Sequence, residues 1–115
     1  MSVIGVGVDI VFLPDFKKAM TKKGFLNRVF SKQEIRFCKN KAFPLQHFAA
    51  RFAAKEAVFK ALGRPVSYAK VEVRTSAAGK PSLSFLSSKP KDTHCKVSLA
   101  HVKEYALAFV VCSKP

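Results

Sequence analysis

The sequence has few acidic residues and no long apolar run. The first feature predicts the kind of partner, and the second excludes a membrane-spanning protein. Of its 115 residues, 7 are Asp or Glu and 21 are Lys or Arg, so the formal net charge is +14. This surplus predicts attraction to a polyanion: nucleic acid, an anionic membrane, a phosphorylated cofactor or an acidic protein. No stretch approaches the roughly 20 apolar residues of a membrane-spanning helix, and no basic leader precedes the apolar N-terminus. We therefore expect neither a membrane span nor a signal peptide.

Several sequence motifs are also missing. The three cysteines, Cys38, Cys95 and Cys112, form no CxxC pair. We interpret them as reduced thiols, which predicts a cytoplasmic protein. The chain has no GxxxxGK[ST], HExxH or GxSxG motif. The segment 5–7 (Gly-Val-Gly) lacks the third glycine of a dinucleotide fingerprint, and no helix follows it in the required place.

What is present predicts one compact domain over residues 1–115, because 49% of the residues are hydrophobic. Helical patterns fill the first half of the chain and alternating patterns fill the second. Ser31 and Glu34 form a capping box, Pro44 can begin a long helix, and Gly63 can end it. The expected helices are 15–20, 31–39 and 44–62, with a helical or irregular link at 25–30. The expected strands are 3–12, 68–74, 82–86, 96–101 and 105–111, with a turn at 77–80 and a polar loop at 89–92. This order indicates an α+β fold in which an N-terminal strand and helices precede antiparallel strands.

Two carboxylates stand where the patterns call for apolar side chains. Asp9 is the only charged residue in 3–12, which is typical of a buried strand. Glu56 projects from a predicted apolar helix face, and Lys60 follows one turn later. That face comprises Leu45, Phe48, Ala49, Phe52, Phe59 and Gly63. Burying an ionised carboxylate is costly, so two of them near a lysine suggest a Mg²⁺ site that handles phosphate. The alternative is a pair of partly exposed carboxylates, with Glu56 paired to Lys60 at i, i+4.

Several segments together resemble the holo-[acyl-carrier-protein] synthase family, the small 4′-phosphopantetheinyl transferases. The matching segments occur in the family's order and cover nearly the whole chain. They are GVDIV at 7–11, FLNRVFSKQEI at 25–35, ARFAAKEAVFKALG at 50–63, GKP at 79–81, VSLAH at 97–101 and YALA at 105–108. The segment 50–63 is highly specific to the family, whereas GKP alone is a weak signal.

The resemblance implies a 4′-phosphopantetheinyl transferase-like fold and an enzyme that moves the 4′-phosphopantetheine arm of coenzyme A onto a serine of apo acyl carrier protein. It also implies Mg²⁺, release of adenosine 3′,5′-bisphosphate, and a homotrimer with sites at the subunit interfaces. By motif, Asp9 and Glu56 would be the magnesium ligands, Lys60 would contact the pyrophosphate, and Arg51, Lys80, Pro81 and His101 would help to bind coenzyme A. The base for the carrier serine stays open between Glu56 and a metal-bound water.

The resemblance also implies a binding partner for the positive charge, because acyl carrier proteins are acidic. Lys32, Arg36 and Lys39 lie on one stripe of the capped helix, with Arg28 before them. We expect this stripe to steer the carrier, although a merely solvated helix face is the alternative.

The chain departs from the family at two places. The family commonly has an acidic residue after Asp-Ile-Val and an arginine shortly beyond, where this chain has Phe12 and Asp15. Arg28 or Lys17 could compensate for the missing arginine. The segment after Gly63 is also shorter than usual, which predicts a more open site.

A small basic nucleic-acid-binding module is the alternative function. The charge and the 11 phenylalanines are compatible with it. However, the phenylalanines fall mainly on periodic core faces, and no RNP-like or GXXG signature occurs. This alternative also leaves Asp9 and Glu56 unexplained, so we expect no nucleic acid partner.

Overall fold

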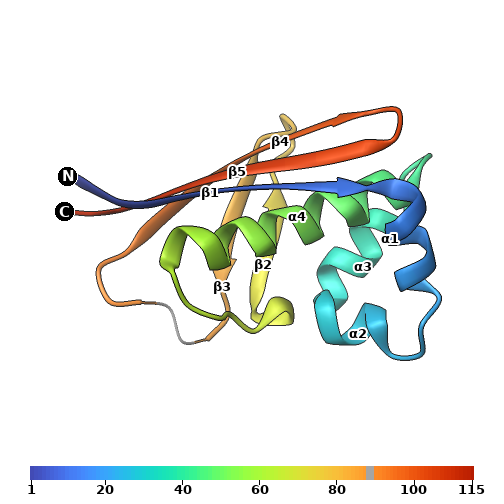
Figure 1. Ribbon diagram of the computed structural model, residues 1–115, viewed down its shortest axis with the longest axis horizontal. Helices are drawn as coiled ribbons and strands as arrows, with labels where there is room; N and C mark the ends of the chain where they lie inside the picture. The colour runs from blue at the N-terminus through green and yellow to red at the C-terminus, as the bar shows by residue number, and fades with distance from the viewer. Residues whose placement is uncertain (88–89) are drawn as a thin grey trace.

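A computed structural model describes residues 1–87 and 90–115 (Figure 1). Its helices are α1 (Leu13–Met20), α2 (Phe25–Val29), α3 (Lys32–Lys39) and α4 (Pro44–Leu62), with a 3₁₀ helix η1 (Tyr68–Lys70). Its strands are β1 (Ser2–Phe12), β2 (Val71–Thr75), β3 (Pro81–Phe85), β4 (His94–Val102) and β5 (Tyr105–Lys114). One antiparallel sheet has the order β1-β5-β4, and a second pairs β2 with β3. The expected α+β layout is confirmed.

Local signals account for most of these boundaries. Ser31 caps α3 by accepting from the Glu34 backbone N–H, and the Glu34 carboxylate accepts from the Ser31 N–H. Gly63 ends α4 in the left-handed region at φ 68°, where glycine carries no steric penalty. Two boundaries were predicted wrongly by three residues. Tyr68–Lys70 form η1, so that strand begins only at Val71, and β5 continues to Lys114. The loop predicted at 89–92 begins outside the described residues.

Two glycines let β1 lie directly on α4. A Cβ at Gly5 would overlap the carbonyl oxygen of Ala61, and one at Gly7 would overlap that of Ala57. On the helix side, Ala57 is fully buried and Ala61 nearly so. The short Gly-Val-Gly segment therefore serves close strand–helix packing, and this packing fixes where the following residues of β1 lie along α4.

The predicted apolar face of α4 is wrong in part. Its fully buried side consists mainly of alanines, at 49, 53, 54 and 57, together with Val58, whereas Phe59 is 36% exposed. Arg51 and Lys55 are also buried. The reason is that the sheet needs small side chains where it approaches the helix, so volume rather than hydrophobicity selects the buried side.

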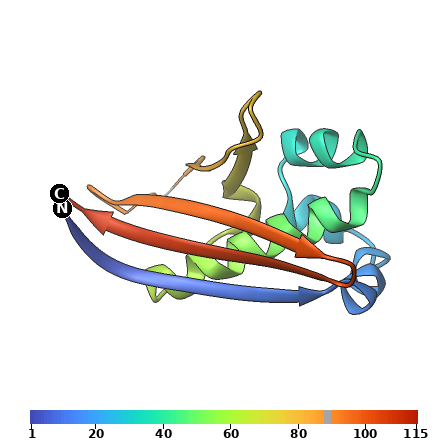
Figure 2. The same ribbon diagram turned by 90° about the horizontal axis from the view of Figure 1, so that it is seen from above.

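The prediction that residues 3–12 form a buried strand is wrong for one face of β1. Figure 2 looks onto the sheet from the side opposite α4, and no described element covers that face. Val6, Val8 and Ile10 are each at least half exposed there, and Phe109 of β5, paired with Val8, is 43% exposed. We call these four residues the open sheet face. Such a contiguous apolar surface usually marks an interface.

The helices at the other end of the molecule are joined to β2 by a buried ion pair. Lys55 Nζ donates to Glu34 Oε1 at 2.8 Å, and both side chains are 0% exposed. The same ammonium donates to the carbonyl oxygens of Tyr68 and Val71, at 2.7 and 2.5 Å. Glu34 Oε2 accepts from the Val73 N–H at 2.9 Å. All three donors of Lys55 and both oxygens of Glu34 are therefore used, which makes this pair a structural clamp.

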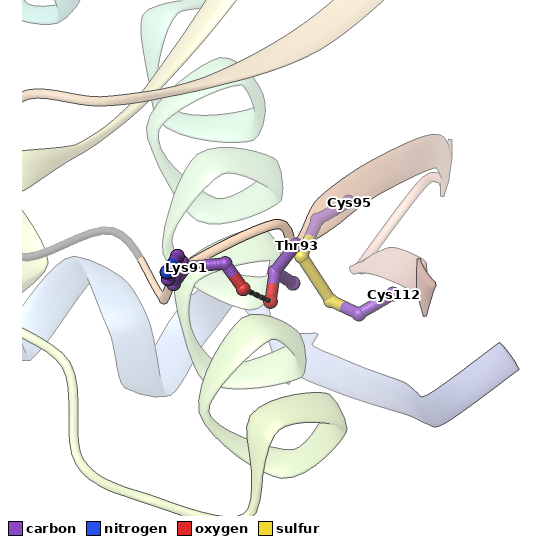
Figure 3. The surroundings of a disulfide bond; sticks show 4 residues. All are labelled: Lys91, Thr93, Cys95 and Cys112. Atoms are coloured by element: carbon purple, nitrogen blue, oxygen red, sulfur yellow. Dashed lines mark hydrogen bonds between the residues drawn. A yellow bond between two sulfur atoms is a disulfide. The ribbon is translucent and has the colours of Figure 1, made fainter. Parts of the chain in front are cut away.

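The prediction of three reduced thiols is wrong for two of them. Cys95 and Cys112 are directly opposite in the β4–β5 pairing and form a disulfide (Figure 3). Beside it, the fully buried Thr93 donates its hydroxyl to the Lys91 carbonyl at 3.2 Å. Cys38 is free, and burial raises the pKa of its thiol to about 11. The argument from reduced thiols to a cytoplasmic location therefore fails, and that location stays a prediction.

Within the described residues, no helix combines the length and the apolarity that crossing a membrane requires.

Candidate functional site

Asp9 lies on the side of β1 that faces α4, and its partner is Lys60. Lys60 Nζ donates to Asp9 Oδ1 at 3.2 Å and to the Val8 carbonyl at 2.9 Å. The two side chains are 53% exposed for Lys60 and 19% exposed for Asp9. The alternative that paired Lys60 with Glu56 is not what the structure shows. The ammonium reaches across to the strand and leaves Glu56 to another partner.

That partner is Tyr68, which the sequence analysis did not single out. Its hydroxyl donates to Glu56 Oε1 at 3.0 Å. Burial, this hydrogen bond and the charges of Glu56 and Asp9 raise the pKa of the Tyr68 phenol above its ordinary value. Within the described residues, Asp9 Oδ2 and Glu56 Oε2 accept no hydrogen bond. Each carboxylate is therefore held by one oxygen and has the other available.

Asp9 and Glu56 line one open pocket, which we call the carboxylate pocket. Aromatic side chains form much of its wall: Phe12, Phe16, Phe25 and Phe52. Asp15, the first-turn acid of α1, also lines it. The described residues contain no cluster of three or more His, Cys, Asp or Glu that could hold a metal. Two carboxylates with free oxygens still fit Mg²⁺, because this cation usually takes one or two protein carboxylates and completes its shell with phosphate oxygens and water.

A second pocket, which we call the basic pocket, lies between α3, α4, β2, β3 and β4. Its cationic or titratable lining residues are Lys41, His47, Arg51 and His101, and its described lining includes no acid. Its volume is about 310 Å³, large enough for part of a nucleotide. Such a lining selects an anion.

Arg51 is the most constrained member of the basic pocket. It is 2% exposed, it stacks 4.2 Å above the Phe37 ring, and its Nη2 donates to Thr75 Oγ1 at 2.8 Å. Its Nε is buried without a hydrogen-bond partner among the described residues. Burial lowers the pKa of the guanidinium. An unused buried donor in a pocket without acids is a place where a bound anion would gain most.

His47 joins this pocket although the sequence analysis gave it no role. Its ring lies 6.3 Å from that of His101 and 6.2 Å from that of Phe37. Burial lowers the pKa of His47, and the charges of Arg51, Lys41 and His101 lower it further. The signal that could have found it is its position one helical turn before Arg51.

The structure thus divides the residues predicted to bind coenzyme A and metal. Asp9 and Glu56 share the carboxylate pocket with Lys60 beside Asp9, whereas Arg51, Pro81 and His101 share the basic pocket. Lys80 lies in neither and lines a further cavity between β3 and β4, next to Pro81. The predicted carrier stripe, Lys32, Arg36 and Lys39, is exposed along α3.

Comparison with known proteins identifies the family. The sequence model of the 4′-phosphopantetheinyl transferase superfamily matches residues 5–110. A holo-[acyl-carrier-protein] synthase of Protochlamydia amoebophila is 41% identical over 122 residues, which cover 96% of this chain and 98% of that protein.

Solved structures agree with the sequence comparison. A holo-(acyl-carrier-protein) synthase of Bacillus anthracis in complex with coenzyme A (3′,5′-ADP) superposes with a TM-score of 0.87 at 31% identity, covering 100% of both chains. The holo-[acyl-carrier-protein] synthase of Helicobacter pylori in complex with coenzyme A gives 0.82 at 31% identity, covering 94% of this chain and 99% of that one. The fold, the motif order and these relatives agree, and the chain belongs to the 4′-phosphopantetheinyl transferase superfamily.

Proposed function

We propose that this protein transfers the 4′-phosphopantetheine group of coenzyme A to a serine of apo acyl carrier protein, with Mg²⁺, and releases adenosine 3′,5′-bisphosphate. The observation that carries the proposal is the pairing of Asp9 and Glu56 in one pocket, each with a free carboxylate oxygen. Its relatives are holo-[acyl-carrier-protein] synthases, and solved structures of such enzymes include complexes with coenzyme A. A nucleic-acid-binding module would have no use for this pocket.

The reaction is a phosphoryl transfer, which depends on positioning and charge neutralisation more than on covalent catalysis. The serine oxygen forms a bond to the β-phosphorus of coenzyme A, and the bond from that phosphorus to the bridging oxygen breaks. The electron pair leaves with the adenosine 3′,5′-bisphosphate. Mg²⁺, held by Asp9 and Glu56, supplies charge neutralisation at the pyrophosphate when bound.

Glu56 in the carboxylate pocket and Lys60 beside it each have a role in this scheme. Glu56 accepts the serine proton, directly or through a water, because the nucleophile is a neutral hydroxyl. The Lys60 ammonium is half-exposed beside Asp9, so it can turn to a pyrophosphate oxygen and stabilise the leaving group.

The basic pocket takes the anionic nucleotide end of coenzyme A. Arg51 and His101 face a bound phosphate there, with Lys41 and His47 as further cations or donors. Pro81 lines both this pocket and the adjoining cavity, and Lys80 lines that cavity.

Assembly joins the two pockets in this proposal. Arg51 and Glu56 leave α4 about 140° apart around its axis, so the two pockets of one chain face different directions. A homotrimer that buries the open sheet face would let the basic pocket of one subunit complete the carboxylate pocket of the next. Val6, Val8, Ile10 and Phe109 offer the apolar surface for that contact.

The acidic carrier docks through the exposed stripe of Lys32, Arg36 and Lys39, with Arg28 before it. Asp15 lines the carboxylate pocket, and the family resemblance implies an arginine in that region of the chain. We therefore expect this enzyme to prefer carriers that present no acid to Asp15.

Intact-mass analysis of an apo carrier protein tests the proposed activity. Incubation with this protein, coenzyme A and Mg²⁺ should add the mass of one phosphopantetheine group to the carrier. Omitting Mg²⁺, or replacing the carrier serine by alanine, should prevent the gain. A carrier of unchanged mass in the complete mixture, across several acidic carriers, would overturn the proposal.

A further inference from the structure

Tyr68 contacts α4 at three residues, which are Phe52, Lys55 and Glu56. Its ring packs against Phe52 with centroids 5.8 Å apart. Its carbonyl accepts from Lys55 Nζ at 2.7 Å. Its hydroxyl donates to Glu56 Oε1 at 3.0 Å. The 3₁₀ helix η1 is therefore fixed on α4 by a buried ammonium, and this clamp sets the place from which the hydroxyl reaches Glu56.

The Tyr68 hydroxyl donates a hydrogen bond to Glu56, as the Lys60 ammonium donates one to Asp9. In each case one carboxylate oxygen is held by a donor from another segment of the chain. The second oxygen then has fewer orientations open to it, and both acidic residues line the same pocket. A free glutamate side chain would lose rotamer entropy on binding a cation, about 1.5–2 kcal/mol for full immobilisation. A donor that has already ordered the side chain removes part of that cost.

We propose that Tyr68 is a positioning residue that holds Glu56 in the orientation in which its free oxygen binds the divalent cation. This inference rests on the proposed function of the carboxylate pocket. A hydrogen bond to the non-ligating part of a metal-binding group commonly changes metal affinity about 10- to 100-fold.

The test compares Tyr68→Phe with wild type by direct cation binding. Phenylalanine keeps the ring against Phe52 and leaves the backbone carbonyl to Lys55, so the fold should be retained. Mn²⁺ serves as the probe, with free Mn²⁺ measured by its electron paramagnetic resonance signal in the presence of coenzyme A. A solution of Mn²⁺ and coenzyme A without protein gives the blank. We expect Mn²⁺ to bind Tyr68→Phe at least about tenfold more weakly than wild type.

Two further measurements separate positioning from a general structural role. The thermal midpoint of Tyr68→Phe without metal should stay within a few degrees of wild type, and its KM for the carrier should be unchanged. Raising Mg²⁺ should restore much of its kcat. The matched control is Tyr105→Phe, which removes the chain's other phenol, a hydroxyl with no hydrogen bond among the described residues. This control should bind Mn²⁺ as wild type does.

The outcomes distinguish this inference from the proposed function. If wild type forms holo carrier and binds Mn²⁺, and Tyr68→Phe binds Mn²⁺ equally well, Tyr68 has no positioning role and the proposed function stands. If wild type neither binds Mn²⁺ beyond the blank nor modifies a carrier, the proposed function itself fails. Equal weakening in Tyr105→Phe would also contradict the role of Tyr68.

Discussion

The carboxylate pocket and the basic pocket are both built on α4, yet they select opposite charges. Glu56 and Asp9 keep free oxygens and suit a cation, whereas Arg51 has an unused buried donor and suits an anion. Between Arg51 and Glu56 on the helix lies Lys55, whose three donors are all used within the fold. Arg51, Lys55 and Glu56 differ not only in residue type but also in how many of their donors or acceptors are used within the fold. A charged group whose partners are complete holds the structure, and one whose partners are incomplete is available to a ligand.

The largest expected effect follows from removing either free carboxylate. Asp9→Ala and Glu56→Ala should each lower the transfer rate at least about a hundredfold, because each removes an oxygen that holds the cation. Far-ultraviolet circular dichroism should show both variants folded. Glu104→Ala, which removes an exposed acid in the β4–β5 turn, is the control and should keep wild-type activity. Near-wild-type turnover in Asp9→Ala or Glu56→Ala would show that the residue has been assigned wrongly.

The next effect concerns the residue between the two pockets. Lys55→Met should destabilise the protein by about 3–5 kcal/mol, because it leaves Glu34 charged and buried without its partner. Lys60→Met, which breaks the half-exposed pair, should cost at most about 1 kcal/mol. Urea denaturation of both variants measures this contrast. Similar losses of stability would mean that the two pairs do not differ in the way the structure indicates.

A substitution in the open sheet face should separate the subunits, and with them the two joined pockets, without changing a residue of either pocket. Val8→Asp should turn a trimer into smaller species, because it places a charge in the proposed apolar contact. Transfer activity should fall with it, although every pocket residue is intact. Light scattering at micromolar concentration measures the assembly, and Leu86→Asp, at an exposed apolar residue outside this sheet, is the control. A fully active monomer would remove the need for joined pockets.

Exposed charges away from both pockets should have a smaller effect that depends on salt. Reversing Lys32, Arg36 and Lys39 to Glu should lower kcat/KM for the carrier about tenfold at low salt, while KM for coenzyme A stays the same. The effect should shrink above about 0.1 M salt, since exposed charges are then screened. Steady-state kinetics with each substrate varied in turn checks this. The same reversal at Lys91, Lys103 and Lys114 is the control, and an equal loss there would reject a specific docking stripe.

The smallest effect should come from His47. Its pKa lies below the ordinary value because of burial and its cationic neighbours, so near neutral pH it is mostly uncharged. A phosphate bound in the basic pocket would raise that pKa, so binding takes up a proton and this contribution strengthens as pH falls from about 8 to about 6. Calorimetry of coenzyme A binding to wild type and His47→Gln isolates it. We expect the difference in affinity between the two to grow toward low pH, and a constant difference would contradict this role.

The sequence was sufficient where the signal is local. The capping box of Ser31 and Glu34, the proline that begins α4 and the glycine that ends it are each set by a few neighbouring residues, and all were predicted. The two carboxylates were found because a charge in an apolar pattern is visible without the fold. Their shared pocket depends on Gly5 and Gly7, whose contact with α4 the pattern does not reveal.

What the sequence did not reveal depends on long-range packing. The buried side of α4 is decided by how closely the sheet approaches, and Tyr68 reaches Glu56 only because η1 is clamped to Lys55. The disulfide is different, because the spacing of its two cysteines in the sequence was enough to predict it. Cys95 and Cys112 are equally far from the turn at Lys103 and Glu104, so the hairpin register already places them opposite one another.

A mixing experiment tests most directly whether the two pockets form one site between subunits. Glu56→Ala disables the carboxylate pocket, and His101→Ala disables the basic pocket at an exposed residue. Each variant alone should be nearly inactive, but co-expressed chains should form mixed trimers in which some interfaces pair two intact pockets. Random assembly of equal amounts predicts recovery to about a quarter of the wild-type transfer rate per site. A mixture no more active than the sum of the two variants would contradict a site shared between subunits.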